Sequence, residues 1–130
     1  MPPKKYEEHL VRGTELLKNL DLGAPGPSVG DMQVFESPFF KAGAQFSFEG
    51  GVCHRVRLPE LWHCVVTHKW PFGDLTVQLL QDFSQPSPWR FAIIGGTGAY
   101  EGAHGEVTYV YNGGNTPPQP DEVTFRFSTR

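Results

Sequence analysis

The stretch that decides the fold is Phe91-Ala-Ile-Ile-Gly-Gly-Thr-Gly-Ala-Tyr-Glu-Gly-Ala-His-Gly-Glu-Val107, in which glycines separate an apolar run from an alternating one. Glycine adopts positive φ and allows close approach of another segment, so this composition favours a tight corner between two strands. The alternative is a dinucleotide-binding motif, because Gly96, Gly98 and Gly102 have GxGxxxG spacing. That motif requires a helix directly after the glycines. Residues 106–111 are instead rich in β-branched and aromatic side chains, so the stretch predicts a strand corner.

Turn-forming residues divide the rest of the chain into segments of strand length. The first segment could also form a helix, but Gly13 and Thr14 interrupt its leucine pattern and favour a strand. We expect the second strand to break or reach a sheet edge at Ser37-Pro38, and the third to bend or bulge at Gly50-Gly51. The expected strands are residues 6–22, 32–36, 45–58, 61–70, 75–83, 89–94, 105–111 and 122–128.

Eight strands joined by short turns predict an all-β, eight-stranded antiparallel up-and-down barrel of the calycin type, with a short N-terminal extension. The barrel is expected to form one domain over residues 1–130, because a chain of this length can bury a sufficient core without disulfides or bound metals. Fifteen Gly and 12 Pro, with 10 Phe, 4 Tyr and 3 Trp, are typical of a turn-rich β protein.

Charge and cysteine content limit the partners and the compartment. The net charge is −3 and no basic block exceeds Lys4-Lys5, which disfavours nucleic acid and anionic membrane surfaces as partners. The N-terminal residues lack the apolar core of a secretory signal, and no stretch reaches the length of a membrane span. We therefore expect a cytoplasmic protein in which Cys53 and Cys64 are free, reduced thiols.

Alternation along residues 61–70 predicts which side chains point into the barrel. His68 is on the face that carries both tryptophans of this segment, and its ordinary pKa near 6.5 suits general acid or base work. A hydrogen-bonded structural histidine is the alternative. The five residues of the expected inward face are Trp62, Cys64, Val66, His68 and Trp70.

In the segment 45–58, Cys53 shares a face with Arg55. If both point inward, Arg55 requires a carboxylate partner, for which Glu15 is the natural candidate, or an anionic group of the ligand. The chain has no HxH, HExxH or CxxC motif, so we expect no metal and no cofactor. Cys64 and His68 lie roughly 13 Å apart along a strand, so they cannot form a hydrogen-bonded nucleophilic pair.

Three motifs carry a resemblance to one superfamily. The turn Gly95-Gly-Thr-Gly98, followed by an aromatic residue, an acidic residue and another glycine, resembles the signature of the allene oxide cyclase and dirigent superfamily. Gly30-Asp31 leading to Phe35 resembles its GD-x-x-x-F motif, and the segment 73–78 resembles its G-x-x-x-V-Q strand. The resemblance spans about residues 10–128, and it implies an eight-stranded barrel with an apolar ligand in the lumen.

The resemblance also implies an activity and a set of site residues. It indicates a cofactor-independent cyclase or isomerase of a hydrophobic, unsaturated substrate of oxylipin or polyketide type. An acidic residue on the first strand of this family projects into the pocket, which corresponds to Glu15, and the G-x-C pattern corresponds to Cys53. Leu17 stands where allene oxide cyclases have Asn. The expected catalytic residues are Glu15, Cys53 and His68, and the expected substrate-binding residues are Arg55, Trp62, Cys64, Trp70, Gln78 and Tyr100.

Several alternatives stay open at this point. Glu15 can be a solvated carboxylate at a strand end, and Tyr100 can cover the glycines instead of closing a mouth of the barrel. The chain can be a non-catalytic, dirigent-like binding protein that steers a hydrophobic intermediate, or a structural oligomer with a packed lumen. Members of the resembled family commonly form trimers, and Val52, Val56 and Leu58 give an apolar outer face. We therefore expect a homo-oligomer, either a trimer or a dimer.

Overall fold

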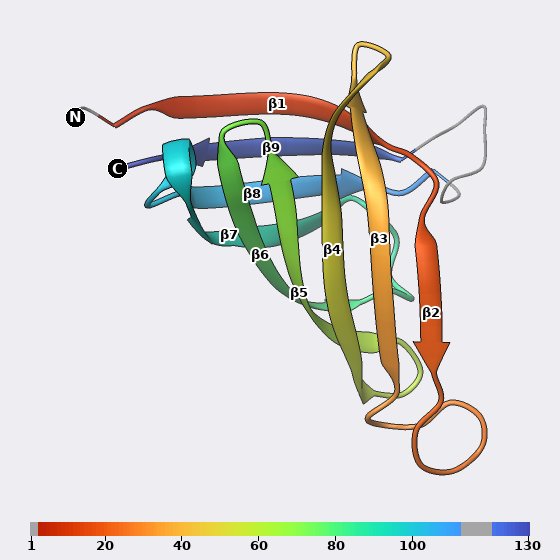
Figure 1. Cartoon of the computed structure of the whole chain (residues 1–130). Helices are drawn as coiled ribbons and strands as arrows, with labels where there is room; N and C mark the ends of the chain where they lie inside the picture. The colour runs from red at the N-terminus through yellow and green to blue at the C-terminus, as the bar shows by residue number, and fades with distance from the viewer. Residues whose placement is uncertain (1–2, 113–120) are drawn as a thin grey trace.

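The computed structural model describes residues 3–112 and 121–130, which form antiparallel strands and one short 3-10 turn (Figure 1). The elements are β1 (Lys5–Arg12), β2 (Leu16–Leu20), β3 (Met32–Lys41), β4 (Ala44–Arg57), β5 (Leu61–Trp70), β6 (Gly73–Asp82), β7 (Trp89–Gly96), η1 (Gly98–Tyr100), β8 (His104–Val110) and β9 (Glu122–Ser128).

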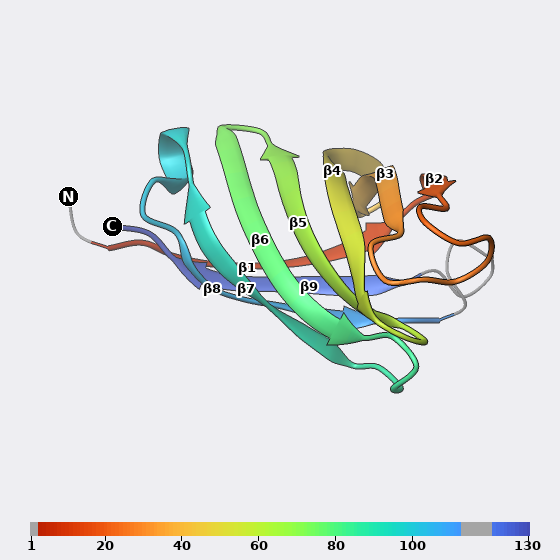
Figure 2. The same ribbon diagram turned by 90° about the horizontal axis from the view of Figure 1, so that it is seen from below.

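The sheet closes on itself. Its strand order is β1-β9-β8-β7-β6-β5-β4-β3-β2, and β1 also pairs with β3. One edge of β1 pairs with β9 along residues 5–11, while Val11 and Arg12 lie opposite Phe40 and Phe39 of β3. Figure 2 shows the curved wall that results. The prediction of an eight-stranded antiparallel barrel is confirmed, with β2 as one additional strand.

The additional strand arises because the first expected strand is broken at residues 13–15. A Cβ atom on Gly13 would lie 2.6 Å from the ring of Phe40, so only glycine allows the chain to pass this close to β3. Beyond the break, β2 pairs with β3 from Leu16 to Leu20. Among the described strands, β2 has no partner on its other edge. The barrel therefore closes through the pairing of β1 with β3, and β2 is an additional strand with one free edge.

Of the two outcomes expected at Ser37-Pro38, the structure shows the sheet edge and not the break. β3 continues through both residues, because Pro38 lies where β3 passes from its pairing with β2 to its pairing with β1. The missing N–H of proline is tolerated at such an edge position. The register of β4 shifts near Arg55 and opposite Phe39, not at Gly50-Gly51. Gly51 instead makes room for a ring, since a Cβ atom there would lie 2.7 Å from Phe35.

The glycine-rich stretch forms the expected corner. β7 and β8 are antiparallel, and η1 lies between them where the dinucleotide motif would need a long helix. Gly98 has φ of 60°, and a Cβ atom on it would lie 2.5 Å from the carbonyl oxygen of Phe72. The chain therefore requires glycine at this position, and the dinucleotide alternative is excluded.

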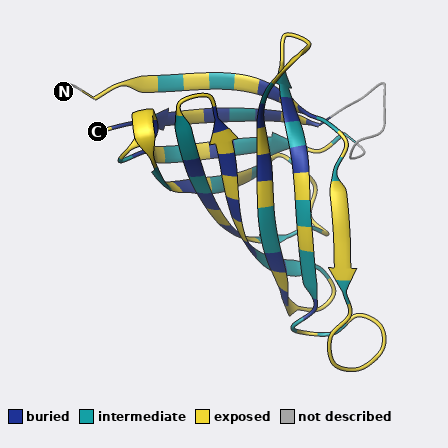
Figure 3. Ribbon diagram, viewed as in Figure 1, coloured by how far each residue is buried: buried dark blue, intermediate teal, exposed yellow. Residues whose placement is uncertain are grey.

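Burial alternates along most strands, as Figure 3 shows. At the end of the barrel near both termini, aromatic rings fill the lumen. Tyr100 packs against Trp70 at 5.4 Å between ring centroids and against Tyr6 at 5.4 Å, and Phe127 stacks on Tyr6 at 4.8 Å. This half of the lumen is a packed core. Within residues 3–112 and 121–130, no helix is long and apolar enough to cross a bilayer.

Candidate active site

The other half of the lumen is hollow and forms a cavity of about 620 Å³. This volume lies in the range of small-molecule sites. Most of the wall is apolar, and aromatic rings from β3, β5, β7 and β8 dominate it. Its aromatic lining residues are Phe35, Phe39, Trp62, Phe83, Trp89, Phe91, Tyr109 and Tyr111.

Three polar side chains form a row across the inner face of the barrel. Ser37 of β3 lies opposite Glu49 of β4, which lies opposite His68 of β5. All three residues are buried, and Glu49 and His68 line the cavity. Within the described part of the chain, Ser37 Oγ and His68 Nδ1 have no hydrogen-bond partner. The rings of Phe39 and Phe125 meet His68 edge to face at 5.4 and 4.9 Å.

Arg12 supplies the positive charge at this corner of the cavity. Its Nη1 donates to Glu15 Oε2 at 2.6 Å, and its Nη2 donates to Asp121 Oδ2 at 2.8 Å. The hydroxyl of Tyr109 also donates to Asp121, which is fully buried. The guanidinium lies 5.3 Å from the centre of the Tyr109 ring. These contacts hold the last residue of β1, and residues 13–15 between β1 and β2, against the start of β9.

Burial changes the proton affinity of two groups in the polar row. Burial, assisted by the negative charge of Glu15 and opposed by Arg12, raises the pKa of Glu49 to about 8. Burial also lowers the pKa of His68 to about 3. His68 is therefore a neutral imidazole across the physiological range, and the expectation of a pKa near 6.5 is wrong. Glu49, by contrast, exchanges its proton close to neutral pH.

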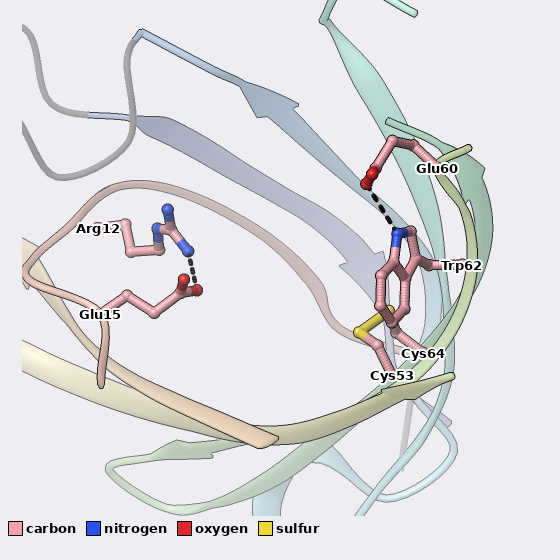
Figure 4. The surroundings of a disulfide bond; sticks show 6 residues. All are labelled: Arg12, Glu15, Cys53, Glu60, Trp62 and Cys64. Carbon is pink, nitrogen blue, oxygen red and sulfur yellow. Dashed lines mark hydrogen bonds and ion pairs between the residues drawn. A yellow bond between two sulfur atoms is a disulfide. The ribbon is translucent and has the colours of Figure 1, made fainter. Parts of the chain in front are cut away.

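The expectation of free thiols is also wrong. Cys53 and Cys64 lie directly opposite each other on β4 and β5 and form a disulfide, with 4.1 Å between their Cα atoms. Their shared inward direction is the physical reason, because opposite residues of antiparallel strands place their Cβ atoms close together. Figure 4 shows the disulfide beside Trp62, apart from the Arg12–Glu15 pair. Both cysteines line the cavity, but Cys53 offers no thiol while this bond exists.

A disulfide is typical of oxidising compartments. The cytoplasmic location therefore stays a prediction, and this cysteine pair does not support it.

Glu15 and Arg55, expected to meet, lie in different places. Glu15 lines the cavity and binds Arg12. Arg55 points inward as expected, but it donates to the Pro59 carbonyl and to Glu60 and lines a separate cavity of about 160 Å³. Trp62 lies between the two cavities, and its Nε1 donates to Glu60 at 3.0 Å.

Three other expected ligand contacts lie outside the large cavity. Trp70 and Tyr100 belong to the aromatic core at the closed end of the barrel. Gln78 lies on the exposed outer face, where its amide is 2.9 Å from the ring of His63. The G-x-x-x-V-Q strand forms as expected, but the inward residue next to its glutamine is Val77. Of the expected set, Glu15, Cys53, Trp62, Cys64 and His68 line the cavity together.

Sequence reasoning missed Arg12, Glu49 and the aromatic wall on β7 and β8. Glu49 lies four residues before Cys53 on the same strand, and both are buried. The alternation that placed Cys53 inward therefore also predicts that Glu49 points inward. Arg12 is two residues after the buried Leu10 of β1 and follows the same rule. In residues 3–112 and 121–130, no three His, Cys, Asp or Glu side chains are grouped as a metal site requires.

Comparison with known proteins identifies the fold. No family model matches the chain, and no curated protein matches it in sequence. Among solved structures, a pyocyanin demethylase superposes with a TM-score of 0.81 at 24% identity, over 94% of this chain and 99% of that one. AbnU, an exo-specific intermolecular Diels-Alderase, gives 0.73 at 11% identity over 98% and 99%.

A pterocarpan synthase dirigent protein gives a TM-score of 0.72 at 14% identity, over 97% of this chain and 87% of that one. The chain therefore has the barrel fold of dirigent proteins and of these enzymes.

Proposed function

We propose that this protein is a cofactor-independent cyclase or isomerase that binds one small, largely apolar, unsaturated substrate in the 620 Å³ cavity. Glu49 transfers a proton to or from the substrate, and the aromatic wall holds the reacting atoms in one arrangement. The observation that carries this proposal is a carboxyl group buried in an apolar cavity with a pKa of about 8. A group that exchanges its proton near neutral pH suits general acid–base catalysis.

The surroundings of Glu49 support this role. Arg12 and Glu15 lie near enough to act on its charge, so a carboxylate formed during reaction has a cation close by. His68, opposite Glu49 on β5, is neutral and can donate or accept one hydrogen bond. The closed end excludes water from one side of the cavity, which strengthens every charge interaction within it. Orientation and acid–base transfer together can lower a barrier without a cofactor.

The names of the structural neighbours suggest which bond changes to look for. The Diels-Alderase indicates ring formation, and the pyocyanin demethylase indicates loss of a methyl group. We favour intramolecular ring formation or isomerisation for this chain. Both leave the substrate mass unchanged, whereas loss of a methyl group lowers it, so mass spectrometry separates them from demethylation.

The alternative is a dirigent-like binding protein, favoured by the same neighbour comparison and by an aromatic wall that needs no acid to hold a ligand. Under this alternative, Trp62→Ala abolishes product selectivity in a partner enzyme's reaction, whereas Glu49→Gln and Glu15→Gln have little effect. Trp62 is 3% exposed and lines the cavity, so its removal enlarges the site.

The test uses a small-molecule extract of the source organism. Compounds retained by the protein during ultrafiltration are released, identified by mass, and incubated again with wild type, Glu49→Gln or the control Glu36→Gln. Glu36 is exposed on the outer face of β3, so this control makes the same charge change away from the cavity.

We expect wild type and control to convert a retained compound into a product of equal mass, and Glu49→Gln to be at least about 100-fold slower. Equal rates for Glu49→Gln would remove Glu49 from the mechanism. A retained compound that wild type leaves unchanged would favour the binding protein.

A further inference from the structure

The charges around the cavity indicate what kind of ligand it accepts. Arg12 is the guanidinium in the cavity wall, and two carboxylates already share it: Glu15 at 2.6 Å and Asp121 at 2.8 Å. One positive charge therefore faces two negative charges. Glu49 adds a third carboxyl group at the same corner, close enough to Glu15 for the charge of Glu15 to raise its pKa.

A second arginine near the cavity is also paired with two carboxylates. Arg55 lies 3.2 Å from Glu60 and 3.4 Å from Asp31, and Glu60 lines the large cavity. Together, the two guanidinium groups are paired with four carboxylates, and Glu49, whose pKa is about 8, adds a negative charge only at alkaline pH. No lysine lines the cavity in the described part of the chain, and residues 113–120 contain no charged side chain. Both described arginines near the cavity are already paired with carboxylates, so they offer little positive charge to an anionic ligand. A cationic ligand would meet more negative than positive charge.

The wall beside this charged corner is a surface of aromatic rings, which Tyr109 joins to Arg12 and Asp121. Trp89 stacks beside Tyr109 with 5.6 Å between centroids and 23° between planes, and Phe83 meets Trp89 edge to face at 4.9 Å. Phe91 continues the surface beside Tyr109 at 6.3 Å. These four residues line the cavity and are only partly buried. Ring faces attract both flat apolar molecules and cations.

His68 gives an independent sign that a ligand belongs here. Its side chain lines the cavity and is 4% exposed, yet its Nδ1 has no hydrogen-bond partner among the described residues. A buried polar atom of this kind is costly unless something satisfies it. A ligand with one polar substituent would supply that partner.

We propose that the ligand is a flat aromatic molecule with a positive charge, such as a protonated or N-alkylated heteroaromatic ring. Its ring lies against Trp89 and Tyr109, and its charge lies at the corner formed by Glu15 and Glu49. The inference names the substrate class of the proposed function and rests on that proposal for the location of the site.

Binding of such a cation has a further consequence. A positive charge beside Glu49 favours its ionised form, so the carboxyl group releases its proton when the ligand binds. Affinity for the cation should therefore rise with pH until Glu49 is ionised in the free protein. A neutral ligand of the same shape should show no such dependence, because it does not discriminate between the two forms through charge.

The test compares three probes of nearly the same shape at pH 8: N-methylacridinium, uncharged acridine and the anion acridine-9-carboxylate. Binding is followed by quenching of tryptophan fluorescence, since Trp62 and Trp89 line the cavity. We expect the cation to bind at least about tenfold more tightly than acridine, and the anion to bind most weakly. Glu15→Gln and Glu49→Gln should each reduce this advantage, whereas Glu36→Gln should preserve it.

A cation that binds no better than acridine, or does not bind at all, would overturn the inference, as would tightest binding of the anion. A cation advantage that survives in both cavity variants would place the charge elsewhere and overturn it too. If a variant fails to fold, proton release by wild type on adding N-methylacridinium, absent with acridine, keeps the inference testable. Binding requires no turnover, so a cation-selective protein that converts nothing refutes the proposed function alone.

Discussion

Replacing Glu49 with Gln should make the protein more stable at alkaline pH, and the gain should depend on pH in a defined way. Glu49 is 6% exposed and lies at an inward position of β4. Gln has nearly the same shape and no charge at any pH. The substitution therefore removes the ionisation of Glu49 while leaving the packing of the cavity wall largely unchanged.

The size of the effect follows from the difference in proton affinity between the folded and unfolded chain. Burial raises the pKa of Glu49 from the ordinary 4.5 to about 8. Between these values the folded protein keeps a proton that the unfolded chain has lost, so stability falls as pH rises. The fall is about 1.4 kcal/mol for each pH unit, and it ends above pH 8. Over the whole interval it amounts to about 5 kcal/mol.

The assay is urea unfolding at several pH values from 5 to 9, followed by tryptophan fluorescence, for wild type, Glu49→Gln and Glu36→Gln. The free energy of unfolding of Glu49→Gln minus that of wild type should rise steadily up to about pH 8 and then level off. Any constant effect of the amide on packing cancels in this dependence. A difference that is flat with pH, or that falls, would show that Glu49 is not held protonated by burial.

Further predictions concern the corner, the disulfide and the outer face. Gly96→Ala should lower the free energy of unfolding by about 1–3 kcal/mol more than Gly95→Ala. A Cβ atom on residue 96 would lie 2.3 Å from a backbone oxygen, whereas one on residue 95 would have nothing within 4 Å. Equal losses in thermal unfolding would contradict this close approach. Reducing the Cys53–Cys64 bond, which spans 11 residues, should cost about 3 kcal/mol in urea unfolding, and two reactive thiols in unreduced, unfolded protein would refute the pairing. Val65 is 45% exposed and lies opposite Val52 of the expected apolar outer face. Val65→Glu should therefore shift the expected homo-oligomer toward monomer in sedimentation, and a wild type that already sediments as a monomer would exclude the oligomer.

The fold could be predicted because local signals agreed with each other. Strands β5 and β9 match their expected boundaries at both ends, since turn residues and alternating side chains mark them clearly. The break after Arg12 was missed because it depends on a contact with β3, a segment distant in sequence. Pro38 was similarly resolved only by knowing which strand edge it occupies.

The site was harder to predict because its chemistry depends on register between strands. The cysteines were placed on inward faces correctly, but only the pairing of β4 with β5 puts them opposite each other. Glu15 was identified as a cavity residue by resemblance, yet its partner is Arg12 and not Arg55. Alternation gives the face on which a residue lies, but not its position along the barrel. Trp70 therefore faces inward as expected while lying in the filled half of the lumen.

The break after β1 explains why the polar corner lies where it does. Before the break, β1 pairs with β9, and its last two residues also pair with β3 and close the barrel; after it, β2 pairs only with β3 among the described strands. At the break the backbone bonds to both neighbours: the N–H of Arg12 donates to the Asp121 carbonyl at 3.1 Å, and the N–H of Gly13 donates to the Pro38 carbonyl at 2.7 Å. Arg12 ends β1 and binds Glu15, inside the break, and Asp121, just before β9. Arg12, Glu15 and Leu17 line the cavity, so the break borders the lumen and carries charges that would meet a ligand; relocating the break should therefore move these charges.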